Sequence, residues 1–416
     1  MSRHRTPTLG SGAAADAWSA PRVRTYLVAL APALALVAGA CGAAPDAEPA
    51  ATIGEPVTRL SDAELERFAL GRVQFDRIFT PEEGLGPLFN ENQCSACHTD
   101  PASGGTGEQL VRKATRFSTT AGCDPLAEAG GENVRSQATP ALEAHGVERQ
   151  PPPEGATERA RFTTPFLFGL GLVEAVPDET LLENADPDDA DGDGISGRVG
   201  RDAAGRVARF GRKADVATLA DFVASALLLE MGLTSPRFPA EPPVAELAPL
   251  LAETDPALDP EVDAETVALL TDYVRFLAPP PRRLPSNPDE LERIDRGEGM
   301  FHAIGCGSCH TPSLRTAPSD VAAFDRREVR LYSDLLLHDM GPELAGTCGP
   351  AASPREWRTE PLMGLGRREA YLHDGRTYDL REAILLHGGE ATAVRAAFEA
   401  LGRVRQEAIL RFLRTL

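Results

Sequence analysis

Apolar residues recur at helical spacing in several stretches of this 416-residue chain. In the stretch from about Ala214, the i, i+3, i+4 rule places six side chains on one helix face: Val216, Leu219, Val223, Ala226, Leu227 and Glu230. Ser61 and Glu64 form a capping box at the start of another such stretch. Amphipathic stretches also end in YVRFL at 273–277 and ILRFL at 409–413. Alternation typical of strands is weak, so the pattern predicts a mainly α fold.

One apolar run is continuous rather than amphipathic. Residues 26–40 are uncharged, follow Arg22 and Arg24, and end directly before Cys41. About 15 such residues are short for a membrane span and typical of an export signal. The cysteine after the run resembles a bacterial lipobox, and plain signal cleavage is the alternative. We expect a leader at residues 1–40 and an exported, periplasmic protein with a lipid anchor.

A proline-rich stretch at residues 279–288, PPPRRLPSNP, divides the remaining chain. Proline cannot continue a helix, so we expect a linker at 281–288. The expected organisation is a flexible tether at 41–57, an N-terminal domain at 58–280 and a C-terminal domain at 289–416.

The formal net charge of −20 limits the partners. So acidic a surface disfavours nucleic acid and anionic lipid, and it would attract basic proteins. Solubility alone is an equally good explanation. We expect no nucleic-acid binding, and contact with a membrane only through the lipid anchor.

Four of the seven cysteines lie in two Cys-x-x-Cys-His motifs, which comprise Cys94, Cys97 and His98, then Cys306, Cys309 and His310. A thioredoxin-like pair or half a zinc site would not require the histidine. This pattern is the signature of covalent c-type haem attachment, in which the sulfurs form thioethers and the histidine binds iron. Two copies in a chain with an export signal predict two covalent haems. Cys123 and Cys348 remain, and a disulfide between them is possible outside the cytoplasm.

An internal repeat surrounds the two motifs. Gly71 and Phe75 precede the first motif in a G-x-x-x-F pattern, and Gly297 and Phe301 precede the second. With the later aromatic helices, these units resemble class I cytochrome c domains, in which a glycine lets two helices cross closely. The resemblance implies two class I cytochrome c-like domains, the first with a large insertion.

Further segments resemble a specific family. YLHDG at 371–375, followed by LREA at 380–383, is similar to a signature of bacterial di-haem cytochrome c peroxidases, as is the segment with Asp334 and His338. Five more stretches resemble the di-haem c-type oxidoreductases once labelled thiol oxidoreductases: GLGPLFNENQCSACH, GLGLVEAVPD, DPDDADGDGISGR, SDLLLHDMGPEL and EWRTEPLMGLG. Arg212 stands where that subgroup usually has an aromatic residue, which argues against electron tunnelling there.

The resemblance also implies axial ligands. The distal ligand of the second haem is expected fourteen residues after His373, which is His387. Two imidazoles would give a six-coordinate centre suited to electron transfer, and a partly buried loop histidine is the alternative. No histidine lies between residues 99 and 144. His145 is the next one and could reach across to the first iron, but its neighbours favour an exposed loop. We therefore expect an open or water-bound face at the first haem.

Glu230 ends the apolar stripe described above. Burial would raise its pKa toward a value useful for moving a proton. Glu230-Met231-Gly232 also resembles the segment that carries the distal glutamate of the peroxidases. The alternatives are that Glu230 points to water, or that Met231 binds the first iron.

Asp189, Asp191 and Asp193 alternate before Gly194, as in a calcium loop. Gly200 stands where an EF-hand has glutamate, so calcium and an ordinary acidic loop both remain open.

Together these features predict an exported di-haem cytochrome oxidoreductase. Electrons would pass from the C-terminal haem to an N-terminal haem that reduces peroxide, with Glu230 as the proton donor there. The electron donor would be a small periplasmic protein, cytochrome or cupredoxin-like. The alternatives are an electron-transfer cytochrome with both irons six-coordinate, and a di-haem oxidase that modifies a partner protein.

Overall fold

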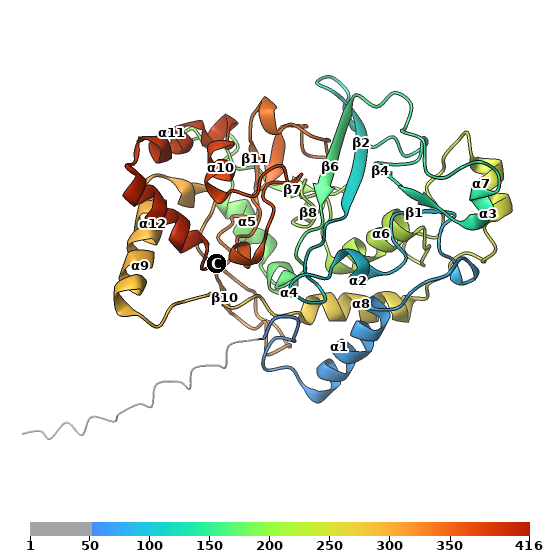
Figure 1. Ribbon diagram of the computed structural model, residues 1–416, viewed down its shortest axis with the longest axis horizontal. Coiled ribbons are helices and arrows are strands. Elements are labelled where there is room, and N and C mark those ends of the chain that lie inside the picture. The colour runs from blue at the N-terminus through green and yellow to red at the C-terminus, as the bar shows by residue number, and fades with distance from the viewer. Residues whose placement is uncertain (1–51) are drawn as a thin grey trace, which may run out of the picture. The chain divides into compact units, whose positions relative to one another are not determined.

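A computed structural model describes residues 52–416 (Figure 1). The predicted leader at 1–40, its Cys41 and most of the predicted tether at 41–57 lie outside the described residues. Within residues 52–416, no helix is long and apolar enough to span a membrane.

The prediction of a mainly α fold built from two class I cytochrome c-like domains is wrong. Only 34% of the described residues are helical, 15% are in strands or bridges, and the strands form several sheets. In the largest sheet, β2 (Leu110–Ser118) pairs with β3 (Gly122–Asp124), β4 (Asn133–Val134) and β6 (Glu158–Thr163), all antiparallel. Most other strands have two or three residues, too few for an alternating pattern to show.

The remaining strands form four antiparallel pairs within residues 52–416. These are β1 (Leu88–Phe89) with β5 (Gln137–Ala138), β7 (Gly200–Arg201) with β8 (Val207–Ala208), β9 (Leu314–Arg315) with β10 (Glu328–Val329), and β11 (Leu337–Asp339) with β12 (Glu356–Arg358).

Two helix pairs organise the helical part (Figure 1). Helix α1 (Asp62–Phe75) packs against α8 (Ala264–Phe276), and α9 (Pro288–Ala303) packs against α12 (Arg403–Leu413). Each pair crosses at a glycine of the repeated motif. A Cβ on Gly71 would lie 2.2 Å from the carbonyl oxygen of Leu269, and one on Gly297 would lie 2.1 Å from that of Ala408.

The other helices are mostly short. They are α2 (Cys94–Cys97), α3 (Pro140–Glu143), α4 (Leu170–Glu174), α5 (Asp178–Asn184), α6 (Leu219–Met231), α7 (Ala248–Thr254), α10 (Leu380–Leu385) and α11 (Thr392–Ala400). Residues 278–287 form no helix or strand, in keeping with the proline-rich sequence there. The domain boundaries around this stretch stay a prediction.

Local capping explains where two helices begin. The capping box at α1 is confirmed, because the Ser61 N–H donates to Glu64 Oε2 at 2.6 Å. Helix α6 begins at Leu219 rather than at about Ala214. Ala214 has a φ of 47°, which is incompatible with a right-handed helix, and Thr218 caps the helix by accepting from the Asp221 N–H.

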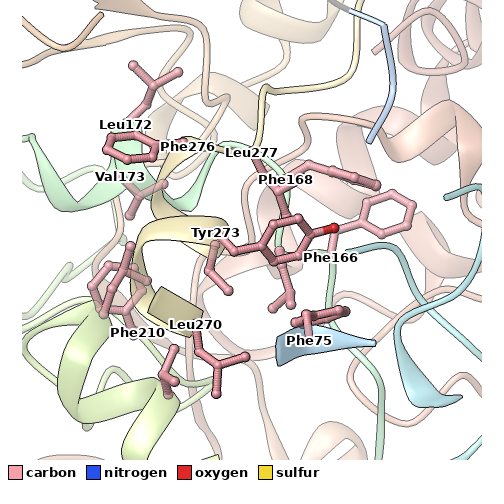
Figure 2. Packing of buried hydrophobic residues seen from close by; sticks show 14 of the residues in the cluster. Phe75, Phe166, Phe168, Leu172, Val173, Phe210, Leu270, Tyr273, Phe276 and Leu277 are labelled. Carbon is pink, nitrogen blue, oxygen red and sulfur yellow. The ribbon is translucent and has the colours of Figure 1, made fainter. Parts of the chain in front are cut away.

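The buried apolar side chains form two main clusters. The larger lies around α1, α6 and α8, and Figure 2 shows Tyr273 of α8 close to Phe75 of α1, with ring centroids 4.8 Å apart. The smaller lies around α9, α11 and α12 and includes Phe301, Phe398 and Phe412. Cys94 packs against the first cluster and Cys306 against the second, so each cluster supports one Cys-x-x-Cys-His motif.

A disulfide joins distant parts of the described chain. Cys123 in β3 bonds to Cys348, 225 residues later, with Cα atoms 5.6 Å apart. The possible pairing of these two cysteines is confirmed. The bond links the four-stranded sheet to the loop before β12.

Candidate di-haem site

The two Cys-x-x-Cys-His motifs line two separate cavities of similar size. Cys94, Cys97 and His98 line the first cavity. Cys306, Cys309 and His310 line the second. In both motifs a single tight turn brings the histidine N–H to the carbonyl of the first cysteine, at 3.1 Å for His98 and 2.9 Å for His310.

Both motif histidines are held in the same way. His98 Nδ1 lies 2.9 Å from the Gly105 carbonyl oxygen, and His310 Nδ1 lies 2.9 Å from that of Tyr332. An Nδ1–H that donates to a carbonyl leaves Nε2 with a free lone pair for a metal. Burial lowers the pKa of both imidazoles to about 4, so both are neutral at pH 7, as metal ligands must be.

His387 lies at the second cavity with His310. Its Nδ1 donates to the Ala383 carbonyl at 2.8 Å, and burial lowers its pKa. The structure thus brings together the two imidazoles expected to bind one iron. His145 is exposed and does not line the first cavity.

The residues at both cavities fit a c-type haem. All four motif cysteines are free thiols, so each pair is available for two thioethers. Burial raises the pKa of Cys94, Cys97 and Cys306 to about 12, so these sulfurs are protonated and apolar in character. Each cavity therefore offers two thiols and at least one neutral imidazole.

Glu230, at the end of α6, lines the first cavity together with His98. Asn90 Nδ2 donates to its Oε2 at 2.6 Å, and Asn133 Nδ2 donates to its Oε1 at 2.5 Å. Asn90 Oδ1 accepts from the Ser136 N–H at 2.9 Å, which fixes the orientation of the side-chain amide. Burial raises the pKa of Glu230, and the hydrogen bond from Asn90 opposes this effect. Met231 also lines this cavity and is otherwise buried in the core.

Sequence reasoning missed other polar groups of the first cavity. Lys113 Nζ lies 2.8 Å from Glu132 Oε1, and Asp215 lines the same cavity. Burial raises the pKa of Asp215 to about 6. These residues, like Asn133, come from strands and turns that lack any recognisable motif, and only chain folding brings them together. Asn90 is the exception, since it lies four residues before Cys94.

A buried histidine with two carboxylate partners adjoins the second cavity. His338 Nε2 lies 2.9 Å from Asp334 Oδ2, and Nδ1 lies 2.9 Å from Glu390 Oε2. Burial alone would lower the pKa of His338, but its hydrogen bonds, led by that to Asp334, raise it to about 12. His338 is therefore an imidazolium that links β11 to the loop after His387.

The carboxylates that lie together in the acidic loop are not the three expected from the sequence. Carboxylate oxygens of Asp186, Asp189 and Asp191 lie within 4.8 Å of one another. Asp193 is not in this group, and its Oδ1 accepts from the Ile195 N–H at 2.8 Å. Asp186 therefore takes the place expected for Asp193 in any set of metal ligands.

A comparison with protein families indicates the same cofactor that the two cavities fit. Residues 155–416 match the family described as "Di-haem oxidoreductase, putative peroxidase". The match spans more than half of the chain, which therefore belongs to the di-haem oxidoreductase family. Membership implies two haems. No curated protein matches the chain.

Solved structures give weak likenesses over most of the chain. One is hydrazine synthase from Kuenenia stuttgartiensis, with 14% identity, 96% of this chain and 100% of that chain covered, and a TM-score of 0.38. Another is a MauG-like protein associated with microbial copper homeostasis, with 14% identity, coverage of 89% and 94%, and a TM-score of 0.36. A third is the diheme peroxidase BthA from Burkholderia thailandensis, with 16% identity, coverage of 89% and 88%, and a TM-score of 0.37. At these scores the likenesses support no statement about function.

Proposed function

We propose that the protein is an exported di-haem c-type cytochrome that reduces peroxide at its first haem. The observation that carries this proposal is the Glu230 carboxylate, which two amide donors hold at the same cavity as His98. An ionisable group with fixed orientation beside a haem site is what proton transfer to a bound oxidant requires.

The chain's own residues would hold both haems. Cys94 and Cys97 would attach one by thioethers, and Cys306 and Cys309 the other. The iron ligands would be His98 at the first haem, and His310 with His387 at the second. Bound haem supplies an iron that exchanges electrons and, where a face is open, binds a small oxidant.

Glu230 would move the protons. Reduction of hydrogen peroxide to two waters consumes two electrons and two protons. Because both carboxylate oxygens accept hydrogen bonds from amides, the ionised form is the better-satisfied one, so Glu230 begins as a proton acceptor. It would take a proton from one peroxide oxygen and return it to the other as the O–O bond breaks. The donor protein supplies the electrons, and solvent supplies the two protons consumed.

The second cavity is suited to a different task. His310 and His387 are both neutral, and each donates Nδ1–H to a backbone carbonyl. With His310 and His387 both as iron ligands, this site would pass electrons rather than bind a substrate. We infer that electrons enter here from a small periplasmic donor, cytochrome or cupredoxin-like, and continue to the first haem. The chain's net charge of −20 favours a donor with a basic face.

Export and calcium belong to the same proposal. The apolar run before Cys41 supports a periplasmic protein with a lipid anchor. The grouped oxygens of Asp186, Asp189 and Asp191 support calcium binding in their loop.

The test compares peroxide turnover of the parent with that of Glu230→Gln, in protein made with both haems attached. Glutamine keeps the shape but cannot shuttle a proton, so turnover should fall by roughly 10²–10⁴-fold. Glu183→Gln, an exposed change on α5 outside both cavities, is the control and should behave as the parent. Turnover of Glu230→Gln within about threefold of the parent would remove Glu230 from the mechanism.

A second candidate function rests on Met231, which also lines the first cavity. If its sulfur filled the open face, the protein would be an electron-transfer cytochrome. A high-spin signal from the first haem of the parent excludes this alternative.

A further inference from the structure

Arg212 is the one residue within 52–416 that lines both haem cavities. It lies in the turn after β8, and its side chain is 11% exposed. Its Nη2 donates to the carbonyl oxygen of Thr163 at 3.0 Å and to Thr163 Oγ1 at 2.8 Å. These contacts fix the guanidinium in the wall between the cavities.

The cations around Arg212 outnumber the carboxylates. Arg358 and Arg368 are the neighbouring arginines, with side chains 9% and 15% exposed. Glu360 lies 2.7 Å from Arg358, 3.0 Å from Arg368 and 4.0 Å from Arg212. The Asp374 carboxylate also acts on Arg212 electrostatically, but it is paired with Arg376 at 2.7 Å. Three guanidinium groups therefore share one carboxylate.

A buried charge without a counter-ion is costly, so this cluster calls for further anions. Burial lowers the pKa of Arg212 to about 10, and the Glu360 carboxylate opposes this effect only in part. Both cavities that meet at Arg212 are shaped by haem-attachment motifs, and every c-type haem carries two propionate carboxylates. A planar guanidinium matches a carboxylate in shape and charge.

We propose that Arg212 binds one propionate carboxylate from each haem, and so acts as a positioning residue shared by both. The proposal rests on the proposed function, because it needs a haem in each cavity. A fixed positive charge near an iron favours the reduced state, which carries one positive charge fewer. A shared arginine therefore raises the reduction potential of both haems together.

Two neighbouring cations serve as matched controls. Lys113 lines the first cavity and not the second, whereas Arg368 lines the second and not the first. If position decides the effect, Lys113→Gln lowers the potential of the first haem only, and Arg368→Gln that of the second only. Of the three variants, only Arg212→Gln lowers the reduction potentials of both haems.

The experiment is an optical redox titration of the mature holoprotein, with haem content checked by mass spectrometry. Arg212→Gln should lower both midpoint potentials, and Arg212→Lys, which keeps the charge, should keep both close to the parent. Should Arg212→Gln not fold, Arg212→Trp replaces it as the neutral variant, because an aromatic residue is usual here in the resembling subgroup.

The outcomes separate this proposal from the function it rests on. With two haems attached, unchanged potentials in the neutral variant overturn it, and a shift of one haem alone also overturns the shared role. A parent that carries fewer than two haems overturns the proposed function itself.

Discussion

Replacing Gly297 by alanine should destabilise the protein, whereas the same change at Gly299 should stabilise it. Both glycines lie inside α9. Gly297 is buried against α12, while a Cβ on the exposed Gly299 would meet no atom within 4 Å. Comparing the two variants therefore separates the effect of helix packing on stability from the effect of helix propensity, within one helix.

The magnitude follows from the contact at Gly297. A Cβ there would lie 2.1 Å from the Ala408 carbonyl oxygen, whereas an ordinary carbon–oxygen contact is about 3.3 Å. Backbone cannot turn aside as a flexible side chain can, so α9 and α12 must separate. Overpacking of this kind costs about 1–3 kcal/mol. Alanine is also favoured over glycine in a helix by about 0.5–1 kcal/mol, a gain common to both variants.

The difference between the two variants therefore reports the clash alone. Thermal unfolding of the parent and of both holoprotein variants measures it. At roughly 1–1.5 °C per kcal/mol for a chain of this length, Gly297→Ala should unfold about 3 °C below Gly299→Ala. Equal midpoints, or the reverse order, would mean that α9 and α12 do not cross at Gly297.

Three further predictions concern other parts of the chain. Removing the disulfide with Cys123→Ser and Cys348→Ser should cost about 2–5 kcal/mol of unfolding free energy, and adding reductant to the parent should reproduce that loss. Burial, followed by the charge of Asp255, raises the pKa of Glu241 to about 8, so its contribution to stability is full below pH 4.5 and is lost as the pH rises through 8. Glu241→Gln should therefore raise the unfolding free energy at pH 9 by about 1–3 kcal/mol and change it little at pH 5. His387→Gly should shift the optical spectrum of the second haem from low-spin toward high-spin, and an unchanged low-spin spectrum would assign the ligand elsewhere.

The fold class was predicted poorly because the strands are short. Strand β2 is long enough to show alternation, but Arg112, Lys113 and Arg116 interrupt its apolar positions. The start of α6 was misplaced for a similar reason. The apolar spacing runs back to Val216. The positive φ of Ala214 and the Thr218 cap instead make the helix begin at Leu219.

The residues expected to attach haem could be identified in the sequence because the chemistry of a Cys-x-x-Cys-His motif is local. Five consecutive residues carry both sulfurs and the imidazole, so the spacing along the chain is also the spacing in space. His387 was predicted from a longer spacing, fourteen residues after His373. It also lines the second cavity.

The surroundings of Glu230 depend on the tertiary structure. Its helix and apolar stripe were visible in the sequence, but its amide partners lie 140 and 97 residues away. The same is true of Arg212, whose neighbours Arg358 and Arg368 lie about 150 residues later in the chain. By itself the sequence determined which residues form the two Cys-x-x-Cys-His motifs expected to attach haem, since those patterns are local. Only the tertiary structure decided which charges face each cavity, because electrostatic energy depends on distance in space and not on separation along the chain.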